Sequence, residues 1–438
     1  MLKAEVMVIG GGAAGVAAAI ASARTGADTL LIEPNGYLGG TITHASLPAF
    51  CPFTDGLKPV IRGIGLELME ALRSATNPVY PYPPSEVSVY NWFPIDTETL
   101  KIILDDKVME SGCRLLLHTV LTDCHTENGR IKSVTLLTSA GLVEAEANIY
   151  IDCSGDGYLS ARAGCEIEVG DKNGDVQSGT LCFKLANFDT QRYMEYARSV
   201  GEGGNMYNAC NRAIVEGKFL PNETNVSGIS FPAPGVAAIN FGHVFHINPL
   251  DPASMTRAET EGRKLLSEML RFFRTYVPGA EKAVVVSSGP SFGVRESRRV
   301  IGRYVLAEED YYARADLNDA IAYYCYPIDM HGSSPDAEEA KRLIEIYKEK
   351  RYQPGEVYGI PYRCLTPKGM HNLLTAGRII SSDRSMQASL RVVPCCFATG
   401  QAAGTAAAMA SSQGIDTDCV NTDKLREMLK ADGVWLKN

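Results

Sequence analysis

The sequence predicts an α/β fold with two domains, one built on a parallel sheet and the other of the α+β class. Three observations support this prediction. The 438 residues are more than one ordinary hydrophobic core accommodates. The chain begins with strand, glycine-rich turn, helix and strand in alternation. From about residue 165 to 350, short strands accompany an amphipathic helix at 256–275, which is typical of a mixed sheet.

The first element is a βαβ unit at residues 5–33. An apolar strand at 5–9 leads into a G-x-G-x-x-G turn, an alanine-rich helix follows at 13–24, and a second strand at 29–32 ends before Glu33. This order is the Rossmann fingerprint of a dinucleotide-binding domain. A glycine-rich turn alone is weak evidence, but here every part of the unit stands in its expected place.

Each glycine of this turn has a physical role. Gly10 permits the tight turn from strand to helix, Gly12 lets the backbone approach a pyrophosphate, and Gly15 lets helix and strand pack closely. The helix N-terminus offers free N–H groups and a positive dipole end to the phosphates. We expect Glu33 to accept hydrogen bonds from the ribose hydroxyls.

The loop after this unit favours FAD over NAD. Gly39, Gly40 and Thr41 follow Glu33 closely, and in glutathione-reductase-like flavoproteins a similar small-residue loop runs beside the pyrophosphate. The sequence contains no second G-x-G-x-x-G unit that follows a strand. We therefore expect one dinucleotide, FAD, and no separate NAD(P)H domain.

The middle of the chain supplies further small residues near the expected cofactor. A helix predicted at 96–111 begins at Asp96 as N-cap, and several strands follow it. The last of these strands leads into Ser154, Gly155 and Asp156, which suit close backbone approach.

The segment 51–94 is rich in proline and aromatic residues. We interpret it as an ordered loop over the site, with an ordinary surface loop as the alternative.

The C-terminal part holds a second helix of small residues. A strand at 372–376 precedes Gly377 and Arg378, and the helix starts at Pro394. Glycine and alanine at 400–404 keep this helix thin. We predict that its start lies against the flat isoalloxazine ring, with close helix–helix packing as the alternative.

Seven segments carry a family resemblance: VIGGGAAGVAAAIASARTGADTLLIE, GYLGGT, IDCSGDGYLSARAG, RESRRVIGRYVL, YPIDMHG, YGIPYRCLTPKGMHNLLTAGRIIS and SLRVVPCCFATGQAAGTAAA. In this order they resemble the bacterial FAD-dependent oxidoreductase family, a branch of the glutathione-reductase-like flavoproteins. They span nearly the whole chain. The sequence departs from the family pattern at Cys153, where alanine is more usual, at Cys395, where threonine is commoner, and at His44, where a small or apolar residue is expected.

The resemblance implies a discontinuous Rossmann-like FAD-binding domain, residues 1–160 and 356–438, with an inserted α+β substrate domain at 161–355. The residues that we expect to contact FAD are Gly10, Gly12, Ala14, Gly15, Glu33, Gly39, Gly40, Thr41, Val120, Ser154, Gly155, Asp156, Gly377, Arg378, Val392 and Val393.

Three residues are candidates for the chemistry. Arg298 lies in an arginine-rich run, where some side chains must face a carboxylate, a phosphate or the flavin; a solvated strand face paired with a glutamate is the alternative. His331 follows Asp329 by two residues and would remove a substrate proton, unless it is a structural histidine. Arg391 directly precedes the small-residue helix and would bind an anionic substrate or the flavin O2 atom.

Two other features receive structural interpretations. The adjacent Cys395 and Cys396 are expected to pack, because a disulfide between neighbouring residues closes a strained ring. His44 is not expected to carry the flavin covalently, although histidines do so in fumarate-reductase-like relatives.

Charge and composition limit the classes of binding partner that we expect. The net charge of −9 disfavours nucleic acid or an anionic membrane as the main partner. The N-terminus lacks the features of a signal peptide and no apolar run is long enough for a bilayer, so we expect a cytoplasmic protein. The twelve cysteines include no C-x-x-C pair, which favours reduced thiols and argues against metal sites and iron–sulfur clusters.

We therefore predict a FAD-dependent dehydrogenase or reductase that transfers hydride between flavin N5 and a small polar organic substrate. The alternatives are a fumarate-reductase-like reductase of an unsaturated carboxylate, a flavin electron-transfer subunit and a non-catalytic FAD-binding protein. Without an NAD(P)H domain, electrons must pass to or from a diffusible partner. The sequence leaves open the substrate, the direction of reaction and whether the protein forms a homo-oligomer.

Overall fold

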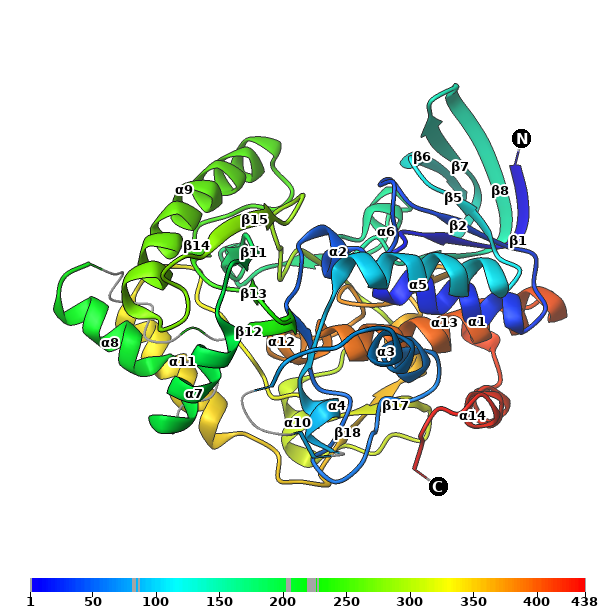
Figure 1. Cartoon of the computed structure of the whole chain (residues 1–438). Coiled ribbons are helices and arrows are strands. Elements are labelled where there is room, and N and C mark those ends of the chain that lie inside the picture. Colours follow the sequence, from blue (N-terminus) through cyan, green and yellow to red (C-terminus); the bar gives the residue numbers. More distant parts are fainter. Residues whose placement is uncertain are drawn as a thin grey trace.

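In the computed structural model of the chain, the described residues are 2–80, 84–85, 87–201, 206–218, 226 and 228–437 (Figure 1). Residues 81–83 and 86, which belong to the segment predicted as a loop over the site, therefore lie outside the described residues.

A seven-stranded sheet joins the two ends of the chain. Its strands follow the order β5-β2-β1-β8-β7-β6, and β19 also pairs with β8. The pairs β1–β2, β1–β8, β2–β5 and β8–β19 are parallel, whereas β6, β7 and β8 form an antiparallel meander. The strands are β1 Leu2–Ile9, β2 Thr29–Ile32, β5 Arg114–Leu116, β6 Val120–Glu127, β7 Arg130–Thr138, β8 Gly141–Asp152 and β19 Leu373–Thr375.

Several parallel strands end at the same edge of the sheet, and a ligand is expected at that edge. In the register of the sheet, Ile9 pairs with Ile32 and Asp152, and Asp152 pairs with Thr375. The carboxyl ends of four strands therefore meet at one edge. In open α/β sheets, ligands bind just outside this edge.

Two buried helices cross the sheet side by side, α1 Ala13–Arg24 and α13 Val393–Gln413 (Figure 1). A Cβ atom added at Gly400 would lie 2.1 Å from the carbonyl oxygen of Ala14, and one at Gly404 equally close to that of Ala18. Only glycine permits this backbone approach. The small residues of α13 thus serve helix–helix packing.

The inserted region has its own sheet and core. The strands β11 Phe183–Ala186, β12 Ile229–Ala233, β13 Val236–Ile239 and β15 Val284–Ser288 pair antiparallel in the order β12-β13-β11-β15. The helices α7 Thr190–Ser199, α8 Tyr207–Val215 and α9 Pro252–Tyr276 accompany this sheet (Figure 1). Phe183, Phe231 and Phe273 belong to its buried core. The α9 helix extends the predicted helix at 256–275 by one turn, because Asp251 caps it and Pro252 occupies its first turn.

The remaining elements are α2 Thr41–His44, β3 Ala49–Phe50, α3 Ile64–Ala75, α4 Ser88–Asn91, β4 Phe93–Pro94, α5 Thr97–Glu110, α6 Tyr158–Arg162, β9 Ile167–Val169, β10 Gly179–Thr180, β14 His243–Val244, β16 Arg298–Val300, α10 Glu308–Ala313, β17 Ala320–Tyr324, α11 Ala337–Glu349, β18 Tyr358–Pro361, α12 Arg384–Leu390 and α14 Thr422–Ala431. Short 3-10 turns lie at Tyr362–Leu365 and Thr417–Cys419.

The prediction of a loop over residues 51–94 is wrong for part of that segment. Helix α3 lies within it and buries Ile64, Leu68, Met69 and Leu72 on one side. These apolar residues recur every three to four positions, which is the helical period. The proline-rich stretch begins only after α3 ends.

The predicted bounds of the inserted domain remain a prediction. Strand β17 falls inside the bounds 161–355, yet it packs against α13 and its residues belong to the core of the seven-stranded sheet. Within the described part of the chain, no single helix has the length and apolarity to cross a membrane; α12 and α13 pass that test only as a pair bent by 92°.

Candidate functional site

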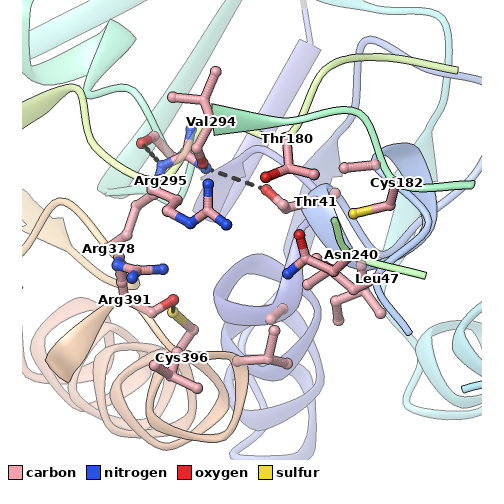
Figure 2. Close-up of a pocket in the computed structure, with 18 of the residues that line it drawn as sticks. Thr41, Leu47, Thr180, Cys182, Asn240, Val294, Arg295, Arg378, Arg391 and Cys396 are labelled. Carbon is pink, nitrogen blue, oxygen red and sulfur yellow. Dashed lines mark hydrogen bonds between the residues drawn. The ribbon is translucent and has the colours of Figure 1, made fainter. Parts of the chain in front are cut away.

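A pocket of about 1690 Å³ lies at the carboxyl edge of the parallel strands and is lined by both regions of the chain. The glycine turn, the loop at 39–41 and the start of α13 form one part of its wall. The other part comes from the inserted region and from residues 79–94. Figure 2 shows side chains from both parts around a common open space.

The glycine turn has the geometry that a pyrophosphate requires. Gly10 has a φ of +99°, and an added Cβ would lie 2.6 Å from the carbonyl oxygen of Cys153. A Cβ at Gly15 would lie 1.7 Å from the carbonyl oxygen of Gly10, so Gly15 serves close packing. A Cβ at Gly12, in contrast, would meet only the Cα of Gly40, at 3.7 Å. The space in front of Gly12 is therefore open, and it lies at the N-terminus of α1, where a phosphate is stabilised.

Glu33 orders this turn from the end of β2. Its Oε2 atom accepts a hydrogen bond of 2.7 Å from the Gly11 N–H, and its Oε1 atom accepts two from Asn35. Burial raises the pKa of Glu33, while the bonds from Asn35 and Gly11 act in the opposite direction. Glu33 also lines the pocket, and its contact with a ribose stays a prediction.

Arg378 joins three segments of the pocket wall. Its guanidinium donates to the Gly155 carbonyl at 2.5 Å, to Asp156 at 2.7 Å, to the Thr41 hydroxyl at 3.2 Å and to the Val294 carbonyl at 3.0 Å (Figure 2). These bonds hold the predicted cofactor loops together. A structural role of Arg378 is therefore visible without any ligand.

The structure gathers most of the predicted cofactor residues around one pocket. All of them except Gly15 line it, namely Gly10, Gly12, Ala14, Glu33, Gly39, Gly40, Thr41, Val120, Ser154, Gly155, Asp156, Gly377, Arg378, Val392 and Val393. The open space at Gly12 and the free N-terminus of α1 fit a dinucleotide. The individual contacts with FAD remain predictions.

The start of α13 corrects one expectation. Val392, Val393 and Cys396 line the pocket, as a helix start near a flavin would. Gly400 and Gly404, however, face the backbone of α1. The prediction that these small residues make room for a flat ring is therefore wrong, and the helix–helix alternative explains them. Cys395 and Cys396 are free thiols.

Three side chains of the pocket form a continuous array. Asp329 Oδ2 lies 3.4 Å from His331 Nε2, and His331 Nδ1 lies 3.1 Å from His243 Nε2. Arg391 donates to the backbone carbonyl of Asp329 at 3.0 Å, and its guanidinium lies 3.5 Å from the Asp329 carboxylate. The amide oxygen of Gln177 accepts from the His331 N–H and fixes the backbone here.

Burial, reinforced by a neighbouring positive charge, keeps His331 neutral. Burial lowers the pKa of His331 to about 3, the positive charge of Arg295 lowers it as well, and Asp329 offsets part of the effect. Burial acts to raise the pKa of Asp329, but His331, Arg391 and Arg295 outweigh it, so that pKa lies well below its usual range. The array therefore contains a carboxylate and a neutral imidazole at neutral pH.

Within the arginine-rich run, the residue that lines the pocket is Arg295 and not the predicted Arg298. Arg298 does not line the pocket; it donates to the Asp156 carbonyl at 2.9 Å and lies over the ring of Tyr158. Arg295, three residues earlier, lines the pocket and donates to the Ser178 carbonyl at 2.7 Å. The stretch before β16 is not regular, so the spacing of these arginines in the sequence does not show which one points inward.

Sequence reasoning also missed His243. It lies in strand β14 of the inserted region, 88 residues before its partner His331. The chain has only seven histidines, so a test of each histidine near an aromatic strand would have included it. Nothing in the local pattern, however, indicates that these two rings meet.

A second group of ligand-type residues lies outside the pocket. His371, Asp416 and Asp418 have ligand atoms within 4.8 Å of one another. Arg130 forms an ion pair with Asp416, and Arg303 does so with Asp418. These ion pairs account for the cluster without a cation.

Comparison with known proteins places the chain among flavoproteins. A family model described as FAD dependent oxidoreductase matches residues 5–429. The chain is similar to a cinnamate reductase from Clostridium sporogenes, with 26% identity over 155 residues, which are 34% of this chain and 22% of that protein. It is also similar to a thiamine thiazole synthase from Aeropyrum pernix, with 29% identity over 136 residues, 31% of this chain and 44% of that protein. The chain thus spans less than half the length of these curated relatives.

Two solved structures illustrate the structural likeness. A geranylgeranyl bacteriochlorophyll reductase-like protein from Thermoplasma acidophilum has a TM-score of 0.47 and 13% identity, with 98% of this chain and 84% of that one covered. A p-nitrophenol 4-monooxygenase from Pseudomonas putida has a TM-score of 0.49 and 8% identity, with 100% and 90% covered.

Proposed function

The chain belongs to the FAD dependent oxidoreductase family, and from that premise we propose that it oxidises or reduces a small anionic organic molecule by hydride transfer to or from flavin N5. The observation that supports this most directly is the array of Asp329, His331 and His243 beside two arginines in one pocket. The bound flavin supplies a hydride acceptor or donor. The residues of the pocket would position the substrate and move its proton.

Arg295 and Arg391 would bind the anionic group of the substrate. Both guanidinium groups line the pocket, and Arg391 lies beside the carboxylate of Asp329 (Figure 2). A planar guanidinium holds a carboxylate by two parallel hydrogen bonds, which fixes the orientation of the substrate as well as its position. Arg295 takes the role that the sequence suggested for Arg298.

The imidazole pair would take up the proton that leaves the substrate. His331 is neutral, and the ionised Asp329 stabilises the positive charge that develops on it. Asp329 and His243 face the two ring nitrogens of His331. The substrate's proton would therefore reach His331 through the ring of His243, and the two rings would share the positive charge. An anion bound at Arg295 would offset the positive charge that lowers the His331 pKa, so substrate binding would strengthen the base.

Reduction of an unsaturated carboxylate is the second candidate. The same two arginines would bind the carboxylate, and the imidazole pair would return a proton to the carbon skeleton. The partial similarity to a cinnamate reductase supports reduction of the substrate over its oxidation.

Anaerobic mixing experiments test both directions. The oxidised holoenzyme is mixed with hydroxy acids, amino acids, amines and uncharged alcohols, and the dithionite-reduced holoenzyme with fumarate and cinnamate, while the flavin absorbance is followed. We expect one class of carboxylate to bleach or restore the flavin band. The proposal fails if only uncharged compounds react, or if none does.

Three variants assign the roles. His331→Ala should keep its FAD but slow the reaction by roughly 10²–10⁴-fold, the usual contribution of a positioned base. Arg295→Gln should weaken substrate binding, whereas Arg298→Gln, which removes the same charge outside the pocket, should change it little. If Arg298→Gln has the larger effect, the assignment from the sequence is restored.

A further inference from the structure

We propose that the inserted region, together with Tyr80 and Trp92, forms a second compartment of the pocket that takes the apolar body of an aromatic carboxylate. This inference rests on the proposed function, because it names the substrate class for the same site. Three features of the pocket support it: an aromatic wall, an amphipathic helix whose apolar face lines the pocket, and buried polar atoms of lining residues that have no hydrogen-bond partner.

The aromatic wall is a fixed part of the structure. Tyr80 and Trp92 line the pocket together with Phe231 of strand β12. The Trp92 indole N–H donates to the Ser230 hydroxyl at 2.8 Å, and the Val79 N–H donates to the Phe231 carbonyl at 2.9 Å. These bonds hold two segments that are some 140 residues apart in one wall. Such a wall suits a flat apolar group.

Helix α11 presents an apolar face to the pocket. Ala340, Leu343 and Ile344 lie on one face of this helix and line the pocket, while its other positions are mostly charged. None of the described side chains of α11 is fully buried, and Ile344 is 41% exposed. The apolar face of α11 is thus only partly covered by the described protein. An apolar ligand in the pocket would supply that cover.

The buried polar atoms mark where the charged end of the ligand would lie. Arg391 Nε, Ser178 Oγ and Thr180 Oγ1 are buried and have no hydrogen-bond partner among the described residues. Ser178 and Thr180 are only 1% and 2% exposed. Figure 2 shows Thr180, Arg295 and Arg391 around the same space. Each of the three unpaired atoms can donate a hydrogen bond to a carboxylate, and leaving them unpaired is unfavourable.

The size of the pocket agrees with such a ligand. Its volume of about 1690 Å³ exceeds the roughly 300–1,000 Å³ of a typical small-molecule site. A dinucleotide at the glycine turn occupies one part. An acid of two or three carbons would leave the aromatic wall and α11 in contact with water, whereas an aromatic acid would fill this space.

Binding of simple carboxylates to the FAD-loaded protein tests the proposal. The probes are acetate, benzoate, 3-phenylpropanoate and uncharged benzyl alcohol, and the readout is the change in the flavin absorbance spectrum on titration. We expect benzoate and 3-phenylpropanoate to bind at least about tenfold more tightly than acetate, because a buried ring adds far more apolar area than a methyl group.

Two variants separate the compartment from the anion site. Ile344→Gln should weaken the binding of the aromatic acids severalfold and leave the binding of acetate unchanged. The matched control is Ile346→Gln, on the same helix but away from the pocket lining, which should change neither. Arg295→Gln should weaken the binding of every acid and leave the binding of benzyl alcohol unchanged.

The outcomes that overturn the proposal are distinct from those that overturn the proposed function. If acetate binds as tightly as the aromatic acids and Arg295→Gln weakens both, the anion site stands and the apolar compartment is refuted. If Ile344→Gln and Ile346→Gln behave alike, α11 does not cover the ligand and the compartment is refuted too. If benzyl alcohol binds as tightly as benzoate and Arg295→Gln has no effect, the compartment stands and the anionic substrate of the proposed function is refuted.

Discussion

A side chain at position 12 would point into the open pocket, with the Gly40 Cα as its nearest neighbour at 3.7 Å. The backbone at Gly12 is extended, with φ −72° and ψ −171°, and any residue adopts that conformation. We therefore expect Gly12→Val to fold normally and to bind FAD at least about a hundredfold more weakly, because its methyl groups would occupy the space of the pyrophosphate.

The measurement for Gly12→Val is the ratio of flavin to protein absorbance after reconstitution, with circular dichroism to verify the fold. Ala23→Val adds volume near the far end of the same helix and serves as the control. Normal FAD content in a folded Gly12→Val protein would contradict the assignment of the turn.

The neutral state of His331 makes the stability of the protein depend on pH. Between its ordinary value of about 6.5 and the lowered pKa of about 3, the unfolded chain binds a proton on this residue that the folded protein does not bind. Stability contributed in this way falls as pH falls, by at most about 1.4 kcal/mol per pH unit for one proton. We expect the Tm of His331→Asn to fall less than the Tm of the wild type when the pH is lowered from 6.5 to 4.5.

Thermal unfolding at a series of pH values measures this difference. The control His125→Asn changes an exposed histidine outside the pocket and should follow the wild-type curve. Identical curves for His331→Asn and the wild type would show that the folded protein protonates His331 in this range.

Among the secondary-structure elements, those with strong local signals could be predicted closely. The helix at 13–24 and the strand at 29–32 have the predicted bounds, and Asp96 caps α5 through bonds to the Glu98 and Thr99 N–H groups. In the segment 51–94 the content of proline and aromatic residues favours a loop, whereas the apolar period of α3 favours a helix, and the helix forms. The small residues of α13 suit contact with a flat ring and with a helix equally well, so the sequence alone does not distinguish the two.

A substitution in α13 tests its contact with α1. A Cβ at Gly404 would lie 2.1 Å from the Ala18 carbonyl oxygen. We expect Gly404→Val to destabilise the protein by about 3 kcal/mol or more, because neither buried helix can move away without disturbing the sheet. The measurement is the midpoint of unfolding. Ser412→Val, in the exposed last turn of α13, is the matched control, and an equal effect of both would mean that helix propensity alone is responsible.

For the molecule as a whole, most of the expected cofactor residues gather at one pocket together with the predicted His331 and Arg391, whereas other residues of the substrate side could not be predicted. The glycine turn, Glu33 and the loop at 39–41 lie within a short stretch of chain, so their spacing alone determines their geometry. His243, Arg295 and the aromatic wall come together only through the tertiary fold. The pairing of a residue near 243 with one near 331 depends on how the inserted sheet packs against the rest of the protein. No local sequence pattern predicts that packing.

The cofactor prediction applies to the intact molecule. We expect the purified protein to be yellow and to release free FAD, not FMN, on acid precipitation, because the sequence has one dinucleotide unit. His44 Nδ1 is held by the Tyr37 hydroxyl at 2.7 Å, which favours a structural role over covalent attachment. Chromatography of the supernatant identifies the flavin. Flavin that stays with the precipitate, and is lost in His44→Ala, would show a covalent bond.

The contact between α1 and α13 also affects how the protein is made. A ribosome adds roughly 5–20 residues per second, and α13 lies about 380 residues after α1. The nascent chain therefore exposes α1, buried in the finished protein from Ala14 to Ser22, for about 20–80 s before its partner helix is synthesised. Chaperone binding in that interval would protect it from aggregation. Because the start of α13 lines the pocket, a cofactor would be held there only after this helix has been synthesised.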